Sequence, residues 1–372
     1  MDTNKFVNRH VGISAEDIPS MLQAIGVKSV DELIDQTIPS DIRLKEPLNL
    51  PEPMTEREFA EHIAELASKN EVFTSYIGMG WYDTVCPAPI QRNVFENPVW
   101  YTSYTPYQAE VSQGRLEALL NFQTVISELT GLPLTNCSLL DEATAAAEAV
   151  TMFHGSRSRA QVKAEANTVF IDENVFASTL AVIHTRMVPQ GIQVVVGDYK
   201  KFEFTPDVFA AIVQFPNADG SIEDYKEFVA RAGAAGAKVG VAADLMSLVL
   251  LTPPGEWGAD VAVGSAQSLG LPMSYGGPYL GFFCSKREYL RKIPGRIVGA
   301  TVDSKGKRTF CLTMQTREQH IRREKATSNI CSNQGIMTLY VAIYLSLMGK
   351  KGLQEAAKKS YIGAHYLYAV SY

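Results

Sequence analysis

Short, continuously apolar runs alternate with helix-like segments between residues 137 and 285. Six runs fit buried strands: NTVFIDE, IQVVVGD, AAIVQFPN, KVGVAAD, DVAVGSA and LGFFCS. Such alternation is typical of a mostly parallel sheet that helices cover on both faces, so it predicts an α/β domain. Ligands bind to sheets of this kind beyond the carboxyl ends of the strands. Four polar residues fall at these ends: Asn217, Asp244, Ser265 and Gln267.

The first 70 residues follow a helical pattern with many charges and little core. Ser14 precedes a segment that ends at Gly26, Ser29 opens a second helix and Thr55 caps a third. Serine and threonine are preferred at these capping positions because their hydroxyl groups accept from free backbone N–H groups. The proline-rich segment 46–53 predicts a linker. We therefore expect a helical arm that packs on another surface.

Residues 73–114 are rich in Tyr, Thr, Pro and Gly and show poor periodicity. An irregular stretch of this length inside a compact chain is more often functional than idle. A helix follows and ends at Gly131.

A basic, polar stretch begins at residue 287 and precedes two predicted helices, 316–334 and 335–349. The second is apolar almost all round and is expected to be buried. We thus predict three parts: a helical arm over 1–70, a large α/β domain over 71–290, and the incomplete start of a small C-terminal domain over 291–372.

The composition excludes several classes of protein. The 372 residues carry a net charge of −6, which gives no support to binding of nucleic acid or anionic membranes. No apolar run is long enough to span a membrane, and the N-terminus has no apolar signal core, so we expect a cytoplasmic protein. The five cysteines and six histidines are scattered, and their spacing predicts neither a metal site nor a disulfide framework.

The stretch 263–278, VGSAQSLGLPMSYGGP, has the outline of a cofactor loop. Together with Asp244 it matches the layout of pyridoxal phosphate enzymes of the aspartate-aminotransferase fold. In that layout an aspartate pairs with the pyridinium nitrogen and a lysine forms the Schiff base. Asp244 stands at the aspartate position, but Gln267 stands at the lysine position. A carboxamide cannot form an imine, because its nitrogen lone pair is delocalised into the carbonyl group.

The expected phosphate site is also altered. A phosphate needs free N–H groups at a helix N-terminus. The candidate helix start, SLLDEATAAAEAV, instead places Asp141 and Glu142 there. These acids would cap the helix and repel a phosphate. The two features predict a degenerate cofactor site, although the loop alone would also suit any doubly wound protein.

Several long stretches resemble the N-terminal half of the glycine cleavage system P-protein, a pyridoxal phosphate glycine decarboxylase. They are RHVG at 9–12, NPVWYTSYTPYQAEVSQGRLEALLNFQT at 97–124, SLLDEATAAAEA at 138–149, PPGEWGADVAVGSAQSLGLPMSYGGP at 253–278, IPGRIVGATVD at 293–303 and REKATSNICSNQ at 323–334. The resemblance implies pyridoxal phosphate fold type I. In this family the C-terminal half keeps the lysine and the phosphate glycines, which the N-terminal half lacks.

The resemblance also implies an activity. Family members decarboxylate glycine and pass the aminomethyl group to the lipoyl arm of H-protein, as a glycine dehydrogenase that is aminomethyl-transferring and decarboxylating. This half would complete the active site and the pseudo-dimer with the half that binds pyridoxal phosphate. We expect a dimer or heterodimer, and no covalent cofactor on this chain. Family half-chains continue past residue 372, so a truncated or aberrant fragment is expected, inactive alone.

We expect no catalytic residue in this half, only a wall of the active site. The candidates are Thr102, Tyr104, Thr105, Tyr107, Gln108, Arg296, Thr327, Ser328 and Asn329. Tyrosine offers a rigid apolar body with one polar tip, which suits a desolvated site. Simple packing of the tyrosines and a solvated basic run stay open as alternatives.

Two other functions also remain open at this stage. The chain could be a scaffold with no share in the active site. It could also be a self-sufficient transaminase or decarboxylase that uses another lysine, such as Lys286 or Lys238.

Overall fold

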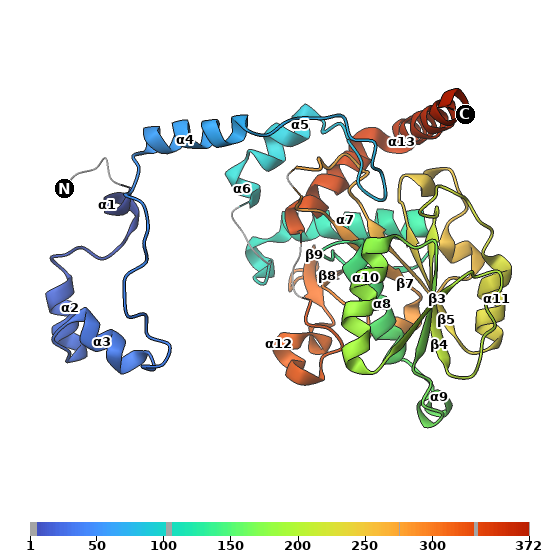
Figure 1. Cartoon of the computed structure of the whole chain (residues 1–372), viewed down its shortest axis with the longest axis horizontal. Helices are drawn as coiled ribbons and strands as arrows, with labels where there is room; N and C mark the ends of the chain where they lie inside the picture. The colour runs from blue at the N-terminus through green and yellow to red at the C-terminus, as the bar shows by residue number, and fades with distance from the viewer. Residues whose placement is uncertain (1–5, 102–105, 275, 331–333, 372) are drawn as a thin grey trace. The chain divides into compact units, whose positions relative to one another are not determined.

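The computed structural model describes residues 6–101, 106–274, 276–330 and 334–371 (Figure 1). The chain divides into two compact units, Met1–Thr74 and Ser75–Tyr372. In the described part of the chain, no helix has the length and apolar character that crossing a membrane requires.

The first unit is helical, as the sequence predicts. Its helices are α1 (Val7–His10), α2 (Ile18–Ile25), α3 (Val30–Thr37) and α4 (Glu56–Ser68). Ser29 accepts from the N–H of Glu32 at 3.1 Å, and Thr55 forms a reciprocal capping box with Glu58. Both predicted caps are therefore confirmed. None of the residues in these four helices is buried, which fits the expectation that this segment has little core of its own.

The first predicted cap, Ser14, is wrong by three residues. Its hydroxyl donates to the carboxylate of Asp17 at 2.6 Å and forms a turn before the helix. Asp17 is the capping residue, and Pro19 lies in the first turn of α2. Proline suits that turn because its missing N–H would have no partner there anyway.

The second unit contains a seven-stranded sheet in the order β1-β7-β6-β5-β4-β2-β3 within the described residues. Its strands are β1 (Leu134–Thr135), β2 (Thr168–Asp172), β3 (Gln193–Gly197), β4 (Val208–Phe215), β5 (Lys238–Ala243), β6 (Val261–Ser265) and β7 (Gly281–Ser285). Five adjacent strands, β6, β5, β4, β2 and β3, run parallel to one another, and β7 is antiparallel to both of its neighbours, β1 and β6. The predicted α/β class, the mostly parallel sheet and all six predicted strands are confirmed.

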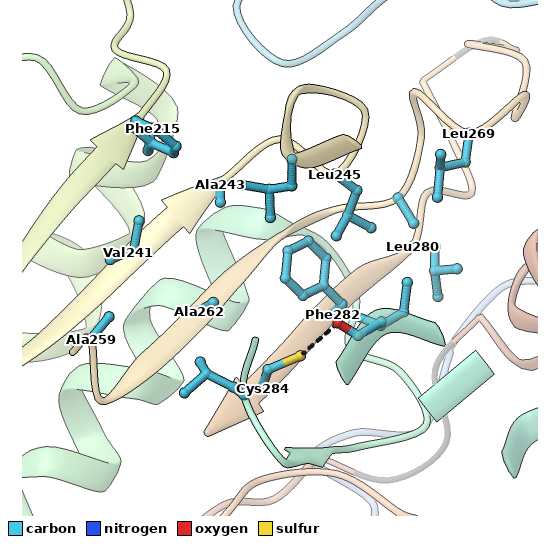
Figure 2. Close-up of a cluster of buried hydrophobic side chains, with 14 of the residues drawn as sticks. Phe215, Val241, Ala243, Leu245, Ala259, Ala262, Leu269, Leu280, Phe282 and Cys284 are labelled. Carbon is cyan, nitrogen blue, oxygen red and sulfur yellow. Dashed lines mark hydrogen bonds between the residues drawn. The ribbon is translucent and has the colours of Figure 1, made fainter. Parts of the chain in front are cut away.

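Two hydrophobic clusters cover the two faces of this sheet. On one face, α8 (Glu142–His154) and α10 (Ala177–Met187) pack on side chains such as Ile171, Ile212 and Val263. On the other face lie α7 (Gln113–Thr130), α11 (Lys226–Ala234) and α13 (Gly335–Ser371). Figure 1 shows the sheet between these groups of helices. Figure 2 shows Leu245 beside the ring of Phe282 in the second cluster. Alternate residues of each strand thus enter opposite clusters.

The remaining described helices are short. They are α5 (Ala88–Ile90), a π-helix (Gln91–Phe95), α6 (Pro98–Tyr101), α9 (Arg159–Lys163) and α12 (Gln319–Arg322). The first three interrupt the irregular segment that the sequence predicts over 73–114.

A hairpin of β8 (Ile297–Val302) and β9 (Arg308–Thr313) was missed by the sequence interpretation, which describes this region only as basic and polar. Val298, Phe310 and Leu312 pack on α7, and much of the rest of the hairpin is exposed. Only one face of the hairpin is buried, and charged residues lie at its turn. The sequence therefore shows no continuous apolar run that would predict these two strands.

The predicted helix over 316–334 is wrong, because α12 has only four residues. Arg317 and Glu318, the two residues that precede α12 in the chain, are buried. The Arg317 guanidinium donates to the backbone oxygens of Ile293 and Gly295 at 2.6 and 2.5 Å. Tertiary contacts therefore override the local helical preference. The prediction for 335–349 is confirmed: Met337 to Leu345 in α13 is largely buried, and α13 kinks at Gly349.

Candidate functional site

A cavity of about 930 Å³ lies at the carboxyl ends of β4, β5 and β6, in the second unit. This is the edge of the sheet at which α/β proteins bind ligands. Six of the described polar residues that line it are Glu142, Gln214, Asn217, Asp244, Ser265 and Ser268. Three of the four strand-end residues that the sequence singles out, Asn217, Asp244 and Ser265, therefore meet here.

Asp244 follows β5 directly and faces the cavity. Its carboxylate accepts from the N–H of Ser247 at 2.7 Å and from the hydroxyl of Ser268 at 2.9 Å. Burial raises the pKa of this carboxyl, and the two hydrogen bonds oppose that shift. The Asp244 carboxylate is thus already hydrogen-bonded by neutral donors.

Gln267 is fully buried, with an exposed fraction of 0%. Its side-chain nitrogen donates to the backbone oxygens of Tyr82 and Leu271, each at 2.7 Å. Its side-chain oxygen accepts from the N–H of Tyr82 at 3.1 Å. The carboxamide therefore pairs with both backbone groups of Tyr82, as a neighbouring strand would. Gln267 ties the loop around Tyr82 to the end of the sheet.

A second hydrogen bond and a glycine turn fix the conformation of the loop that follows Gln267. Thr84 donates to the backbone oxygen of Leu271 at 2.6 Å. Gly276 and Gly277 have φ angles of 104° and 139°, which side-chain-bearing residues rarely adopt. Gly276 and Gly277 thus allow a backbone turn that other residues rarely form. The predicted cofactor loop, 263–278, contains this glycine pair but no lysine.

Asp141 and Glu142 stand at the start of α8, as predicted. Asp141 is the capping residue and accepts from the N–H of Thr144 at 2.7 Å. Glu142 lines the cavity and accepts from the hydroxyl of Thr179 at 3.2 Å. Burial, with a smaller contribution from Asp244, raises the pKa of Glu142 to about 7. A free helix N-terminus would attract a phosphate, but this one is occupied by acids.

The raised pKa of Glu142 predicts that the chain loses stability as pH rises. Between pH 4.5, the ordinary value, and about 7, the folded protein holds a proton that the unfolded chain has released. By linkage, the free energy of unfolding falls through this window by about 3 kcal/mol. Guanidinium unfolding at pH 5 and pH 8 should show a smaller fall in Glu142→Gln than in the unchanged chain. An equal fall in both would contradict the assignment.

A second group of candidates meets near the hairpin. The Arg296 guanidinium donates to the hydroxyl of Tyr107 at 2.8 Å and lies 5.1 Å from the centre of its ring. Arg296 also forms an ion pair with Glu318, and both side chains are buried. The structure therefore brings together two of the wall candidates, Tyr107 and Arg296, which are far apart in the sequence.

The other wall candidates are placed as follows. Thr327 and Ser328 line a narrow pocket of about 10 Å³ beside Gly295 and Glu318. Gln108 and Asn329 are exposed. Thr102, Tyr104 and Thr105 lie outside the described residues.

Sequence reasoning missed Glu318 and Tyr82. Glu318 belongs to a charged segment whose pattern predicts a solvated helix, so no sequence signal marks it as buried. Tyr82 lies in the aromatic segment 73–114, whose composition draws attention to the segment but to no single residue. Among the described residues, no group of three or more His, Cys, Asp or Glu could hold a metal ion.

The fold and the cavity define a class: an α/β protein of pyridoxal phosphate fold type I, with a cavity at the carboxyl ends of its parallel strands. The family model described as glycine cleavage system P-protein matches residues 8–370. The chain therefore belongs to the glycine cleavage system P-protein family, as its sequence resemblance predicts.

Relatives with curated names agree with this assignment. The chain is 61% identical over 359 residues to glycine dehydrogenase (decarboxylating) of Bacteroides fragilis. It is 52% identical over 364 residues to the protein of the same name in Flavobacterium johnsoniae. These matches cover 96% and 98% of this chain but 38% of each relative. The chain thus corresponds to the N-terminal part of a much longer family protein.

A solved structure supports the fold directly. The crystal structure of glycine decarboxylase (P-protein) of the glycine cleavage system, in inhibitor-bound form, superposes with a TM-score of 0.85 at 39% identity. The match covers 96% of this chain and 81% of that one. The α/β architecture is therefore that of a P-protein.

Proposed function

We propose that this chain is the half of a glycine decarboxylase that does not hold the cofactor covalently. It pairs with a half that carries the lysine and pyridoxal phosphate, and together they decarboxylate glycine and pass an aminomethyl group to the lipoyl arm of H-protein. This proposal rests on the family assignment and on the names of the relatives, of which this chain spans 38%.

One observation carries the proposal: the hydrogen bonds of Gln267. Both donor hydrogens of its carboxamide are used on backbone oxygens, and the group is buried. The acids at the start of α8 occupy the place of a phosphate. The residues present therefore do not fit a covalent pyridoxal phosphate. The cofactor supplies an electron sink for decarboxylation when the other half binds it.

A self-sufficient enzyme would need a lysine near Asp244, and the two candidates lie elsewhere. Lys238 begins β5, whose opposite end leads to Asp244. Asp244 lies six positions after Lys238, a span of about 20 Å along a strand. Lys286 follows the antiparallel strand β7 and donates to the carboxylate of Asp260 at 2.8 Å. Both lysines contact Asp260, which precedes the amino end of β6. Neither candidate lysine is therefore placed to act as the nucleophile beside Asp244.

In the proposed role, Tyr107 and Arg296 form part of the wall that this half presents to the active site. The guanidinium fixes the tyrosine hydroxyl by a hydrogen bond and its ring by a cation–π contact. Glu318 neutralises the guanidinium and holds it in place. Tyr107 is 51% exposed in this chain, so its hydroxyl is fixed but remains open to a surface that the other half would cover. A hydroxyl fixed in this way can orient a reacting group without reorganisation. The remaining wall candidates extend the same proposal: Thr102, Tyr104, Thr105, Gln108, Thr327, Ser328 and Asn329.

Replacing Tyr107 by phenylalanine in the full-length enzyme tests whether this half shares the active site. We expect the rate of glycine–bicarbonate exchange to fall about tenfold, because a charge-assisted hydrogen bond worth about 1.5 kcal/mol is lost. The ring and its packing remain. Tyr101→Phe is the matched control, since Tyr101 is 53% exposed, and its exchange rate should not change. Unchanged exchange in Tyr107→Phe would favour a scaffold without a share in the site.

A further inference from the structure

The cavity that remains at the degenerate cofactor site has an unusual charge. Its described lining includes three acids, Glu142, Asp219 and Asp244, and neither lysine nor arginine. A phosphate or carboxylate ligand would therefore meet like charges at short range, which is unfavourable wherever water is excluded. The charge of this lining therefore favours a cationic ligand over an anionic one.

The two inner carboxyls have only neutral partners among the described residues. Asp244 accepts from the N–H of Ser247 and the hydroxyl of Ser268, and Glu142 accepts from the hydroxyl of Thr179. No basic side chain contributes to the pKa of either group, and burial raises both. Buried carboxylates are ordinarily compensated by a cation. A bound cation would supply the missing charge.

The apolar part of the lining suits an organic rather than a metal cation. Phe176, Tyr82 and Tyr361 line the cavity together with Met246 and other aliphatic groups. Aromatic faces attract ammonium and pyridinium groups and also cover the apolar body of such a ligand. The volume of about 930 Å³ lies within the range of pockets for small organic molecules.

We propose that this cavity is a binding site for a small organic cation, a primary amine or a protonated nitrogen heterocycle with one aromatic ring. The ammonium lies between the carboxylates of Glu142 and Asp244, and the ring lies against Phe176 and Tyr82. Gln267 holds the loop that carries Tyr82 in place. The site is separate from the glycine chemistry proposed for the assembled enzyme.

Three ligands of similar size test the proposal: benzylamine, benzyl alcohol and benzoate, titrated calorimetrically into the full chain at pH 8. We expect benzylamine to bind at least tenfold more tightly than the alcohol, and benzoate not to bind. Asp244→Asn and Glu142→Gln should each weaken benzylamine binding about tenfold. Glu203→Gln is the control, because Glu203 is exposed and does not line the cavity, and its affinity should not change.

The pH dependence gives a readout that does not need a variant. Because Glu142 is mostly protonated at pH 6 and mostly ionised at pH 8, benzylamine affinity should rise about tenfold across this range. The other described titratable groups that line the cavity are Asp219, Asp244, Tyr76, Tyr82, Tyr361 and His365. Glu142→Gln should remove most of the rise.

Equal affinity for benzylamine and benzyl alcohol, or no binding of benzylamine at pH 8, would overturn the proposal. Benzylamine binding that is unchanged in both cavity variants would also overturn it, since the cation would then bind elsewhere. These titrations use this chain alone, whereas the proposed function is measured as glycine exchange by the full-length enzyme. Failure of one therefore does not imply failure of the other.

Discussion

Gln267→Lys is expected to destabilise the second unit by about 4 kcal/mol and to leave the chain without a pyridoxal phosphate Schiff base. The substitution removes three hydrogen bonds, to the N–H and oxygen of Tyr82 and to the oxygen of Leu271. The oxygen of Leu271 keeps its hydrogen bond from Thr84, so the loss falls on the two part-buried backbone groups of Tyr82, at about 1–3 kcal/mol each. The new ammonium would also be buried close to the end of the sheet.

The lysine alone would not restore the cofactor site. Asp141 and Glu142 still occupy the helix start where a phosphate would bind. Absorbance with added pyridoxal phosphate, followed by borohydride reduction and peptide mapping, measures the Schiff base directly. Guanidinium unfolding measures the loss of stability. Gln190→Lys is the matched control, because Gln190 is exposed, and its stability should change by less than about 0.5 kcal/mol. A reduced adduct at position 267 would contradict the proposed loss of the site.

The sequence could predict which polar residues lie near the strand-end cavity because these residues stand at strand and helix ends. Asp244 closes an apolar run, Gln267 follows the next predicted strand, and Asp141 and Glu142 precede an alanine-rich helix. Period and polarity place such residues before any tertiary contact is known. The structure adds what Gln267 does: it pairs with the backbone of Tyr82, which lies 185 residues away in the chain.

The second group could not be predicted because tertiary contacts alone assemble it. Tyr107 comes from an aperiodic segment, Arg296 from the start of a hairpin and Glu318 from a segment whose charges favour a solvated helix. Only the packing of the β8–β9 hairpin against α7 brings these elements together. The hydrogen bonds of buried Arg317 to the backbone of Ile293 and Gly295 stand directly before α12, which has only four residues. Local propensity therefore failed where buried charged side chains determine the backbone path.

The buried charges of Arg296 and Glu318 predict a large loss of stability when one of them is removed. Glu318→Ala is expected to destabilise the second unit by about 3–5 kcal/mol, because it leaves the Arg296 guanidinium buried without its carboxylate. The positive charge of Arg317, which is also buried nearby, makes the loss harder to compensate. Burial and the charge of Arg296 lower the pKa of Arg317 to about 10. Guanidinium unfolding of the full chain measures the effect.

The double variant Arg296→Met/Glu318→Leu separates the cost of an unpaired charge from the cost of disturbed packing. We expect it to be more stable than Glu318→Ala by about 2 kcal/mol or more, because apolar side chains of similar volume replace the whole ion pair. Glu324→Ala controls for the loss of an acid from the same segment, since Glu324 is exposed, and its stability should hardly change. If the double variant were as unstable as Glu318→Ala, packing rather than charge would explain the loss.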